Sequence, residues 1–188
     1  TMSEPNILTR RNFVKTSVAA TGSAMFVKPG TAFTYAANSQ LRMGLLGCGG
    51  RGTSVAGDFI NNNDLQITAV GDFFADKTVA AKGELDKTLA GLGRKEIAHR
   101  FTGKNSPQEI ADCKEVDFVY AATPCYYHPE HVRIITEAGK HVYIEKPAAT
   151  DVKGCLEVAK IGKKIDGKLT AHMGFQVRYG AFFQEQTK

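Results

Sequence analysis

Residues 45–54, LLGCGGRGTS, determine the fold class. They follow a short apolar stretch and place Gly47, Gly49 and Gly52 in a G-x-G-x-x-G pattern. In a turn between a strand and a helix, the first glycine permits the tight turn and the second lets the backbone approach a diphosphate. The third lets helix and strand pack closely. Because unpaired N–H groups and the helix dipole favour an anion at a helix N-terminus, the stretch predicts an anion site.

An acidic residue follows at the end of the next apolar stretch. Asp72 comes twenty residues after Gly52 and closes the apolar run 65–70. A carboxylate there accepts hydrogen bonds from the adenosine ribose of NAD and repels the 2′-phosphate of NADP, so NAD is favoured. The nearby cations Arg51 and Lys77 keep NADP as an alternative. Methyltransferases that bind S-adenosylmethionine share this loop-plus-acid layout, so these residues alone do not decide the class.

Strand and helix patterns alternate along the remainder of the chain. Short apolar stretches predict strands at 41–46, 65–70, 99–101, 116–122, 141–144 and 169–177. Helical patterns are expected over 53–60, 76–90, from 106 onward, 129–138 and 151–165. Strands that are apolar throughout and separated by helices form parallel sheets covered on both faces. The predicted fold is therefore α/β, a doubly wound parallel sheet of the Rossmann type over residues 41–179.

The first 36 residues have the organisation of an export signal. Arg10 and Arg11 precede a mildly apolar stretch at 18–27, and small residues surround Ala36. A positive start, an apolar centre and a small-residue cleavage site are typical of a signal peptide. The paired arginines match the signal read by the twin-arginine translocase, which predicts cleavage after Ala36 and a periplasmic protein. The alternative is an amphipathic first helix with a chance arginine pair.

Charge and composition exclude other classes of function. Residues 1–40 carry four of the basic residues against one acid, so the net charge of +5 resides largely in the N-terminus. Without a basic stripe, nucleic-acid binding is not expected, and no apolar run reaches the roughly 18 residues of a membrane span.

The four cysteines lack C-x-x-C spacing and are expected to be structural thiols. His128 and His131 have no evident third ligand, so no metal site is expected.

Two later segments narrow the class further. Residues 121–131 read AATPCYYHPEH, and residues 138–147 read AGKHVYIEKP. With the glycine loop and the strand-end acid before them, they resemble the N-terminal NAD(P)-binding domain of the glucose–fructose oxidoreductase / inositol dehydrogenase / MocA (Gfo/Idh/MocA) family. The resemblance covers roughly residues 41–179. Its specific part is the Glu-Lys-Pro segment, which methyltransferases lack. Exported members of this family with a twin-arginine signal are known.

The resemblance implies a role for each site residue. The glycine loop would hold the pyrophosphate and Asp72 the ribose, while residues 122–124 pack along the cofactor. His128 would stand near the nicotinamide, which residues 145 and 146 would flank. Lys146 would be the catalytic residue that binds and polarises substrate, with a Glu145–Lys146 surface pair as the alternative. The implied cofactor-binding residues are Gly47, Gly49, Gly50, Arg51, Gly52, Asp72, Ala122, Thr123, Pro124, His128, Glu145, Lys146, Pro147 and Arg178.

The same resemblance implies a longer enzyme. Family members continue into a second domain that supplies most of the substrate pocket and usually the oligomer interface. Residues 180–188 are expected to begin that domain, so the chain would be either a fragment of a homo-oligomeric protein or an early-terminating gene product. The implied reaction is hydride transfer between NAD(P) and a sugar, polyol or related hydroxy compound. The alternatives are an NAD-dependent glycoside hydrolase that uses transient oxidation, and a non-catalytic dinucleotide-binding module.

Overall fold

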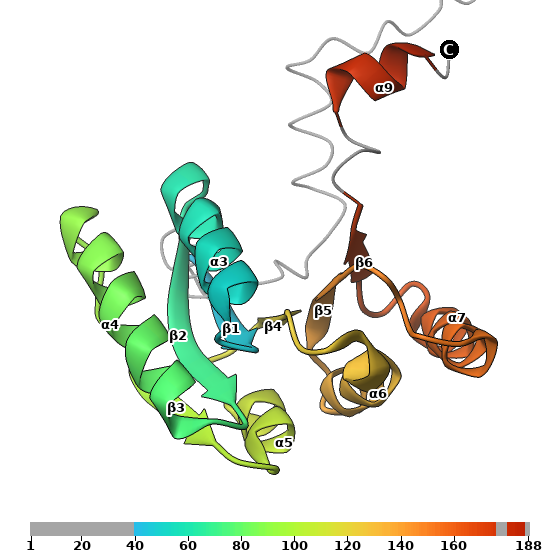
Figure 1. Cartoon of the computed structure of the whole chain (residues 1–188), viewed down its shortest axis with the longest axis horizontal. Helices are drawn as coiled ribbons and strands as arrows, with labels where there is room; N and C mark the ends of the chain where they lie inside the picture. Colours follow the sequence, from blue (N-terminus) through green and yellow to red (C-terminus); the bar gives the residue numbers. More distant parts are fainter. Residues whose placement is uncertain (1–39, 176–179, 187–188) are drawn as a thin grey trace, which may run out of the picture. The chain divides into compact units, whose positions relative to one another are not determined.

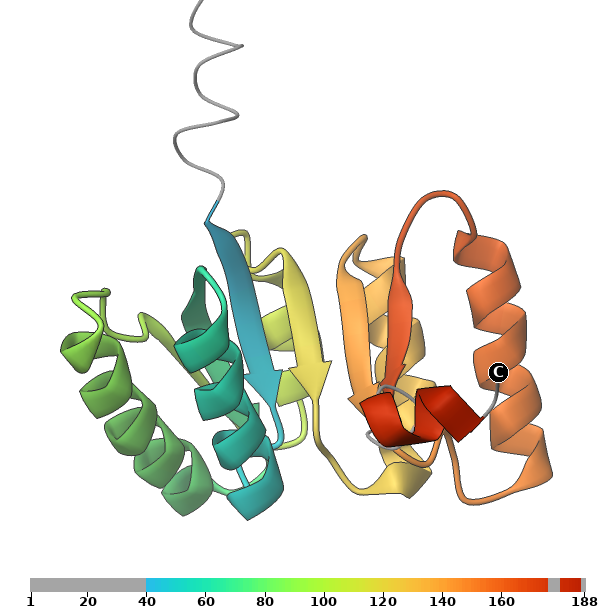
Figure 2. The same cartoon turned by 90° about the horizontal axis from the view of Figure 1, so that it is seen from above.

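The fold is a six-stranded sheet with helices on both faces (Figures 1 and 2). The computed structural model describes residues 40–175 and 180–186, so the predicted signal peptide and Arg178 lie outside the described residues. The strands are β1 Leu41–Leu46, β2 Leu65–Asp72, β3 His99–Thr102, β4 Phe118–Ala121, β5 His141–Glu145 and β6 Ala171–Gly174. The helices are α3 Gly50–Asn62, α4 Ala75–Gly91, α5 Ser106–Asp112, the short 3₁₀ helix η1 Cys125–Tyr127, α6 His128–Glu137, α7 Val152–Ile165 and α9 Ala181–Gln186.

All neighbouring strands are parallel, in the order β3-β2-β1-β4-β5-β6. This confirms the predicted doubly wound α/β fold. The chain moves outward from β1 to β3, returns to the other side of β1 and continues outward to β6. The strand order therefore reverses between β1 and β4, and ligands of open α/β sheets bind outside the carboxyl ends of the strands at such a point.

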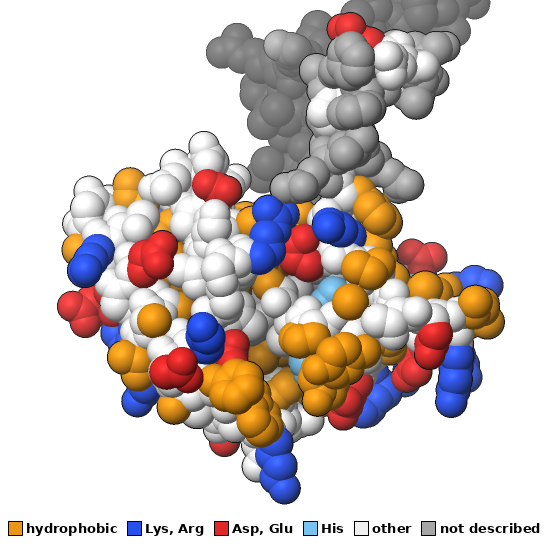
Figure 3. Space-filling model, in the orientation of Figure 1, with side chains coloured by type: hydrophobic (Ala, Val, Ile, Leu, Met, Phe, Trp, Pro, Cys, Tyr) orange, Lys and Arg blue, Asp and Glu red, His pale blue; other side chains and the backbone are white. Residues whose placement is uncertain are grey.

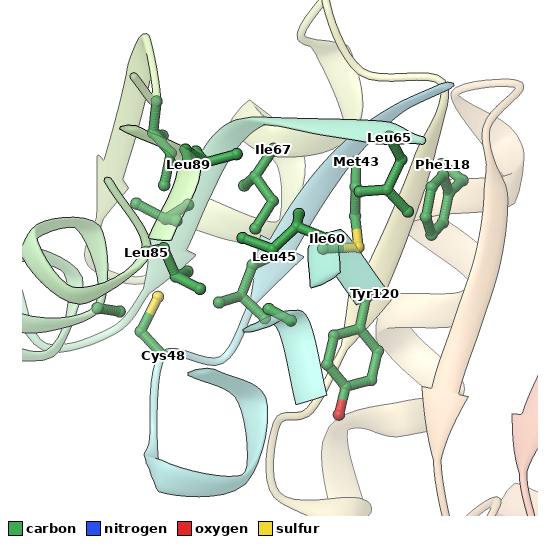
Figure 4. Packing of buried hydrophobic residues seen from close by; sticks show 14 residues of the cluster. Met43, Leu45, Cys48, Ile60, Leu65, Ile67, Leu85, Leu89, Phe118 and Tyr120 are labelled. Atoms are coloured by element: carbon green, nitrogen blue, oxygen red, sulfur yellow. The ribbon is translucent and has the colours of Figure 1, made fainter. Parts of the chain in front are cut away.

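The core on one face of the sheet lies beneath α3 and α4. The buried side chains of α4 recur at helical spacing, which turns one stripe of the helix toward the sheet. Val79 lies outside the stripe and is exposed. Figure 4 shows how this cluster packs. Its larger members are Met43, Leu45, Ile60, Leu65, Ile67, Leu85, Leu89, Phe118 and Tyr120.

The core on the other face lies beneath α5 and α6. Apolar side chains from β1, β2, β4 and β5 meet those of the two helices there, and Ile161 of α7 packs against the same cluster. The shared members include Leu46, Ile110, Val119, Val132, Ile135, Val142 and Ile144. Because strands such as β4 are buried on both faces, their sequences are apolar throughout instead of alternating. Among the described residues, no helix is both long enough and apolar enough to cross a membrane.

Polar contacts fasten the amino ends of the strands. The guanidinium of Arg42 donates two hydrogen bonds to the Asp117 carboxylate, at 2.6 and 3.0 Å, and the Arg42 backbone N–H donates a third at 2.9 Å. Through its hydrogen bond, Arg42 holds the pKa of Asp117 below its usual value. The ammonium of Lys140 donates to the carbonyls of Cys113 and Val116 at 3.0 and 2.6 Å. These contacts tie the starts of β1, β4 and β5 together, at the edge opposite the glycine loop.

Candidate functional site

The glycine loop between β1 and α3 needs two of its glycines for packing. Gly47 has a φ of +95°, and a Cβ there would lie 2.7 Å from the carbonyl atoms of Ala122. A Cβ on Gly52 would lie only 2.0 Å from the Gly47 carbonyl oxygen. Both contacts are with backbone that cannot move aside, so the turn itself excludes any side chain at these two positions.

The other two glycines leave an open space at the start of α3. A Cβ on Gly49 or Gly50 would meet no atom within 4 Å, and both residues are exposed. No side chain caps the helix at Gly49, and its first turn carries no acidic residue. The first N–H groups of a helix need partners from outside it. A diphosphate therefore fits the charge and the space at this helix start.

Asp72 links the glycine loop to the start of α4. Its Oδ2 accepts a hydrogen bond from the Cys48 N–H at 2.7 Å, and its Oδ1 accepts one from the Phe74 N–H at 2.9 Å. A carboxylate offers about four acceptor directions, so these two bonds leave capacity for a sugar diol. The acid is thus held at the carboxyl end of β2, one strand away from the loop.

A buried carboxylate joins the glycine loop to β5. Glu145, at the end of β5, has a side chain only 8% exposed, and its Oε1 accepts hydrogen bonds from Arg51 Nε at 3.0 Å and Tyr120 OH at 2.9 Å. Arg51 Nη2 lies 2.9 Å from the same oxygen. Burial, together with the hydrogen bond that Tyr120 donates to Glu145, raises the pKa of Tyr120 well above its ordinary value. In Figure 4 the Tyr120 hydroxyl points away from the apolar cluster. Glu145 therefore pairs with Arg51 instead of forming the surface pair with Lys146.

A pocket of about 420 Å³ opens at this edge of the sheet. It gathers residues from the glycine loop and from the segments after β4 and β5, so three separate parts of the sequence meet in one place. The side chain of Lys146 is exposed at the pocket, in contrast to the buried Glu145 beside it. The lining residues are Arg51, Ala122, Thr123, Pro124, Cys125, Glu145 and Lys146. All except Cys125 are among the residues that the sequence predicts for the cofactor site.

Two buried histidines contact the segments that line the pocket. His128 is only 1% exposed, with Nδ1 2.7 Å from the Pro147 carbonyl oxygen and Nε2 2.9 Å from that of Thr123. It therefore joins the segments after β4 and β5, and its place near the nicotinamide stays a prediction. His131 Nδ1 lies 2.8 Å from Thr123 Oγ1. Burial, and the nearby His128, lower the pKa of His131 to about 4.

Two contributors to the site escaped the sequence analysis. Tyr120 was part of a predicted buried strand, and the available signal was that a buried tyrosine hydroxyl needs a hydrogen-bond partner. Cys125 lies at the start of η1, and no spacing pattern marks it.

Cys48 is buried in the loop with Sγ 3.5 Å from the Gly71 carbonyl oxygen. Burial, and the neighbouring Asp72, raise the pKa of Cys48 to about 12, which fits a structural thiol.

Comparisons with known proteins agree with this geometry. A family model described as "Oxidoreductase family, NAD-binding Rossmann fold" matches residues 41–173. A "Glycosyl hydrolase family 109 protein" of Solibacter usitatus is 31% identical over 155 residues, covering 79% of this chain and 35% of the relative. "Inositol 2-dehydrogenase 3" of Saccharopolyspora erythraea is 32% identical over 120 residues, covering 64% of this chain and 31% of the relative.

A solved structure shows the same fold. The crystal structure of myo-inositol 2-dehydrogenase from Lactobacillus plantarum superposes with a TM-score of 0.64 at 24% identity, covering 78% of this chain and 40% of that one. The chain thus spans about a third of the length of the curated relatives it matches.

Proposed function

The chain belongs to the Gfo/Idh/MocA oxidoreductase family with its NAD-binding Rossmann fold, and from this membership we propose that it is the cofactor-binding part of an enzyme acting on a sugar or polyol. The proposed reaction is hydride transfer between NAD and a hydroxyl-bearing carbon. The observation that carries the proposal is the pocket in which Arg51, Thr123, Glu145 and Lys146 meet, beside the open start of α3. A relative named for inositol oxidation supports the substrate class.

One group of residues would bind the cofactor, and Lys146 would bind the substrate. The open helix start at Gly49 and Gly50 would bind the pyrophosphate, and Asp72 would accept hydrogen bonds from the ribose. When bound, NAD supplies the nicotinamide carbon that accepts or returns the hydride. The exposed ammonium of Lys146, at the pocket, would hold the reacting hydroxyl and assist in moving its proton. Glu145, which precedes that lysine in the chain, is held by Tyr120 and Arg51.

Substitution of Lys146 tests the catalytic assignment. In the complete enzyme, Lys146→Met should lower turnover by about 10²- to 10⁴-fold, the range of one acid–base group. NAD affinity, measured by calorimetry, should change little, because the pyrophosphate and ribose contacts are untouched. Lys153→Met, at an exposed lysine of α7, is the matched control and should leave turnover unchanged. Full activity in Lys146→Met would contradict the catalytic role of Lys146, whereas NAD binding without turnover in the unsubstituted complete protein would favour the non-catalytic dinucleotide-binding module.

A second candidate function is supported by the relatives named for glycoside hydrolysis. In such an enzyme the same NAD site would serve a transient oxidation, after which the sugar is reduced again. Product analysis on the complete protein separates the two. An oxidised sugar with accumulating NADH supports the dehydrogenase, whereas a released free sugar with unchanged NAD and no net NADH supports the hydrolase.

We also propose that the protein is exported through the twin-arginine translocase to the periplasm. The support is the order of Arg10-Arg11, an apolar stretch and small residues near Ala36. Replacing both arginines by lysine should keep the protein in the cytoplasm, as measured by fractionation of cells that express the complete protein. An unchanged periplasmic fraction would contradict the proposal.

A further inference from the structure

Two adjacent aromatic side chains stand exposed directly after Asp72. Phe73 is 62% exposed and Phe74 is 59% exposed, and their rings pack edge to face with centroids 5.1 Å apart. Figure 3 shows hydrophobic side chains at the surface near the carboxyl end of β2. Single exposed apolar residues are ordinary, but a contiguous exposed pair beside a binding site points to a ligand with an apolar face.

Hydrogen bonds fix this pair relative to the glycine loop. The Asp72 carboxylate accepts from the Phe74 N–H at 2.9 Å and from the Cys48 N–H at 2.7 Å. One carboxylate thus connects the start of α3, where the pyrophosphate would lie, with the start of α4, where the two rings lie. The backbone on the other side is fixed as well, because the Gly103 N–H donates to the Asp72 carbonyl at 3.0 Å.

We propose that Phe73 and Phe74 form the stacking platform for the adenine ring of the dinucleotide. This inference rests on the proposed NAD site: a ribose held by Asp72 carries its base on the adjoining carbon, so the base lies within a few ångströms of the acid. Aromatic side chains stack on the faces of nucleic acid bases, with a contribution of about 1–3 kcal/mol per base. The residues that follow Asp72 are Phe-Phe-Ala, whose side chains bear no charge, so a planar ring fits there better than a further phosphate.

The platform also defines what part of the base is recognised. Phenyl rings have no hydrogen-bond donors or acceptors, so they contact the face of the base and not its edge. The site should therefore bind a dinucleotide with hypoxanthine in place of adenine about as well as NAD. It should bind nicotinamide mononucleotide, which lacks the second base, without any contribution from the two phenylalanines.

The test is calorimetric titration of the full chain with NAD, AMP and nicotinamide mononucleotide. In the double variant Phe73→Ser/Phe74→Ser, the Kd for NAD and AMP should rise by about 5- to 100-fold, while that for nicotinamide mononucleotide stays the same. The double variant Phe73→Tyr/Phe74→Tyr keeps the rings and should bind like the original chain. Tyr126→Ser, at a tyrosine that is 60% exposed on η1, is the matched control.

Two results would overturn the inference while leaving the proposed function intact. One is unchanged NAD and AMP binding in the serine double variant, and the other is an equal loss for AMP and nicotinamide mononucleotide, which would mean that the rings do not act on the base. A chain that binds NAD at no concentration up to the millimolar range would contradict the proposed function itself. Thermal unfolding of each variant without nucleotide shows that the comparison is between folded proteins.

Discussion

The glycines of the loop fall into two groups at the scale of single residues. Gly47 and Gly52 are required by the protein, since a Cβ on either would overlap backbone atoms of the turn. Gly49 and Gly50 are not, because a Cβ on them would meet nothing within 4 Å. The second group therefore leaves open the space in which we propose that the pyrophosphate binds, while the first shapes the turn beside that space.

This division predicts opposite effects for two alanine substitutions. Gly52→Ala should lower the free energy of unfolding by about 1–3 kcal/mol or more, because its Cβ would lie 2.0 Å from the Gly47 oxygen. Gly49→Ala should change that free energy by less than about 1 kcal/mol but raise the Kd for NAD at least tenfold. Urea denaturation without nucleotide and calorimetric titration with NAD measure the two quantities.

Equal destabilisation by both substitutions would mean that Gly49 is also required for packing. Unchanged NAD affinity in Gly49→Ala would mean that the pyrophosphate does not approach this part of the loop. Gly57→Ala serves as a control, because a Cβ on this residue of α3 also meets nothing within 4 Å.

Residues with a short local pattern could be read from the sequence, and residues that act through distant contacts could not. The glycine loop and Asp72 are recognisable because their spacing is fixed by one strand–helix–strand unit. The Tyr120–Glu145 hydrogen bond joins residues 25 apart, and the Arg51–Glu145 bond joins residues 94 apart. Such pairs depend on the order of strands in the sheet, and a single sequence does not contain that order. The burial of His128 between two loops was missed for the same reason.

At the scale of elements, the six strands and the helices α3 to α7 were predicted in the right order, their ends were less accurate, and η1 and α9 were not predicted. Helix α3 was expected from residue 53, but it begins at Gly50. Glycine is a poor helix former, so the sequence favours a later start, whereas packing of Gly52 against the loop brings the first turn into the helix. Strand β4 was expected over 116–122 but spans Phe118–Ala121. Its start is displaced because Val116 is in a turn, with its N–H bonded to the Cys113 carbonyl.

Two arginine–glutamate pairs allow a prediction about the contact between α3 and β5. The Arg51–Glu145 pair and the Arg133–Glu137 pair of α6 each have a separation of 2.9 Å. The glutamate side chain is 8% exposed in the first pair and 51% exposed in the second. Arg51→Gln should therefore lower the free energy of unfolding by about 1–3 kcal/mol, since it leaves a buried carboxylate short of a partner. Arg133→Gln should cost about 0.5 kcal/mol or less.

Urea denaturation at pH 7 without nucleotide measures both effects. Comparable losses in the two variants would show that burial of Glu145 does not strengthen the contact. The double variant Arg51→Gln/Glu145→Gln extends the test, because removing both charges should recover part of the stability lost in Arg51→Gln.

At the scale of the whole molecule, His131 makes stability depend on pH. Its pKa is lowered to about 4 by burial and by His128, so between that value and about 6.5 the unfolded chain binds a proton that the folded chain does not. The contribution of His131 to the free energy of unfolding is complete above pH 6.5. As the pH falls toward 4, up to roughly 3 kcal/mol of stability is lost. His131→Gln should therefore flatten the pH dependence of the free energy of unfolding in this range.

Denaturation curves between pH 4 and 7.5 provide the measurement. An identical slope in His131→Gln and in the unsubstituted chain would contradict the assignment. The Asp117 carboxylate, whose pKa is lowered by Arg42, makes the free energy of unfolding depend on pH in a separate, more acidic range. Its contribution is present above the carboxyl pKa of the unfolded chain, about 4, and is lost as the pH falls below that value.

The contacts of Arg42 and Lys140 fasten one edge of the sheet, while the glycine loop, Asp72 and Lys146 occupy the other. The contacts that fasten the strands and the residues of the proposed site therefore lie at opposite ends of the same strands. Changes in the loops at the carboxyl ends of the strands leave the contacts of Arg42 and Lys140 in place. Relatives named for hydrolysis and for oxidation both match this one domain, in line with the rule that a single fold serves different functions.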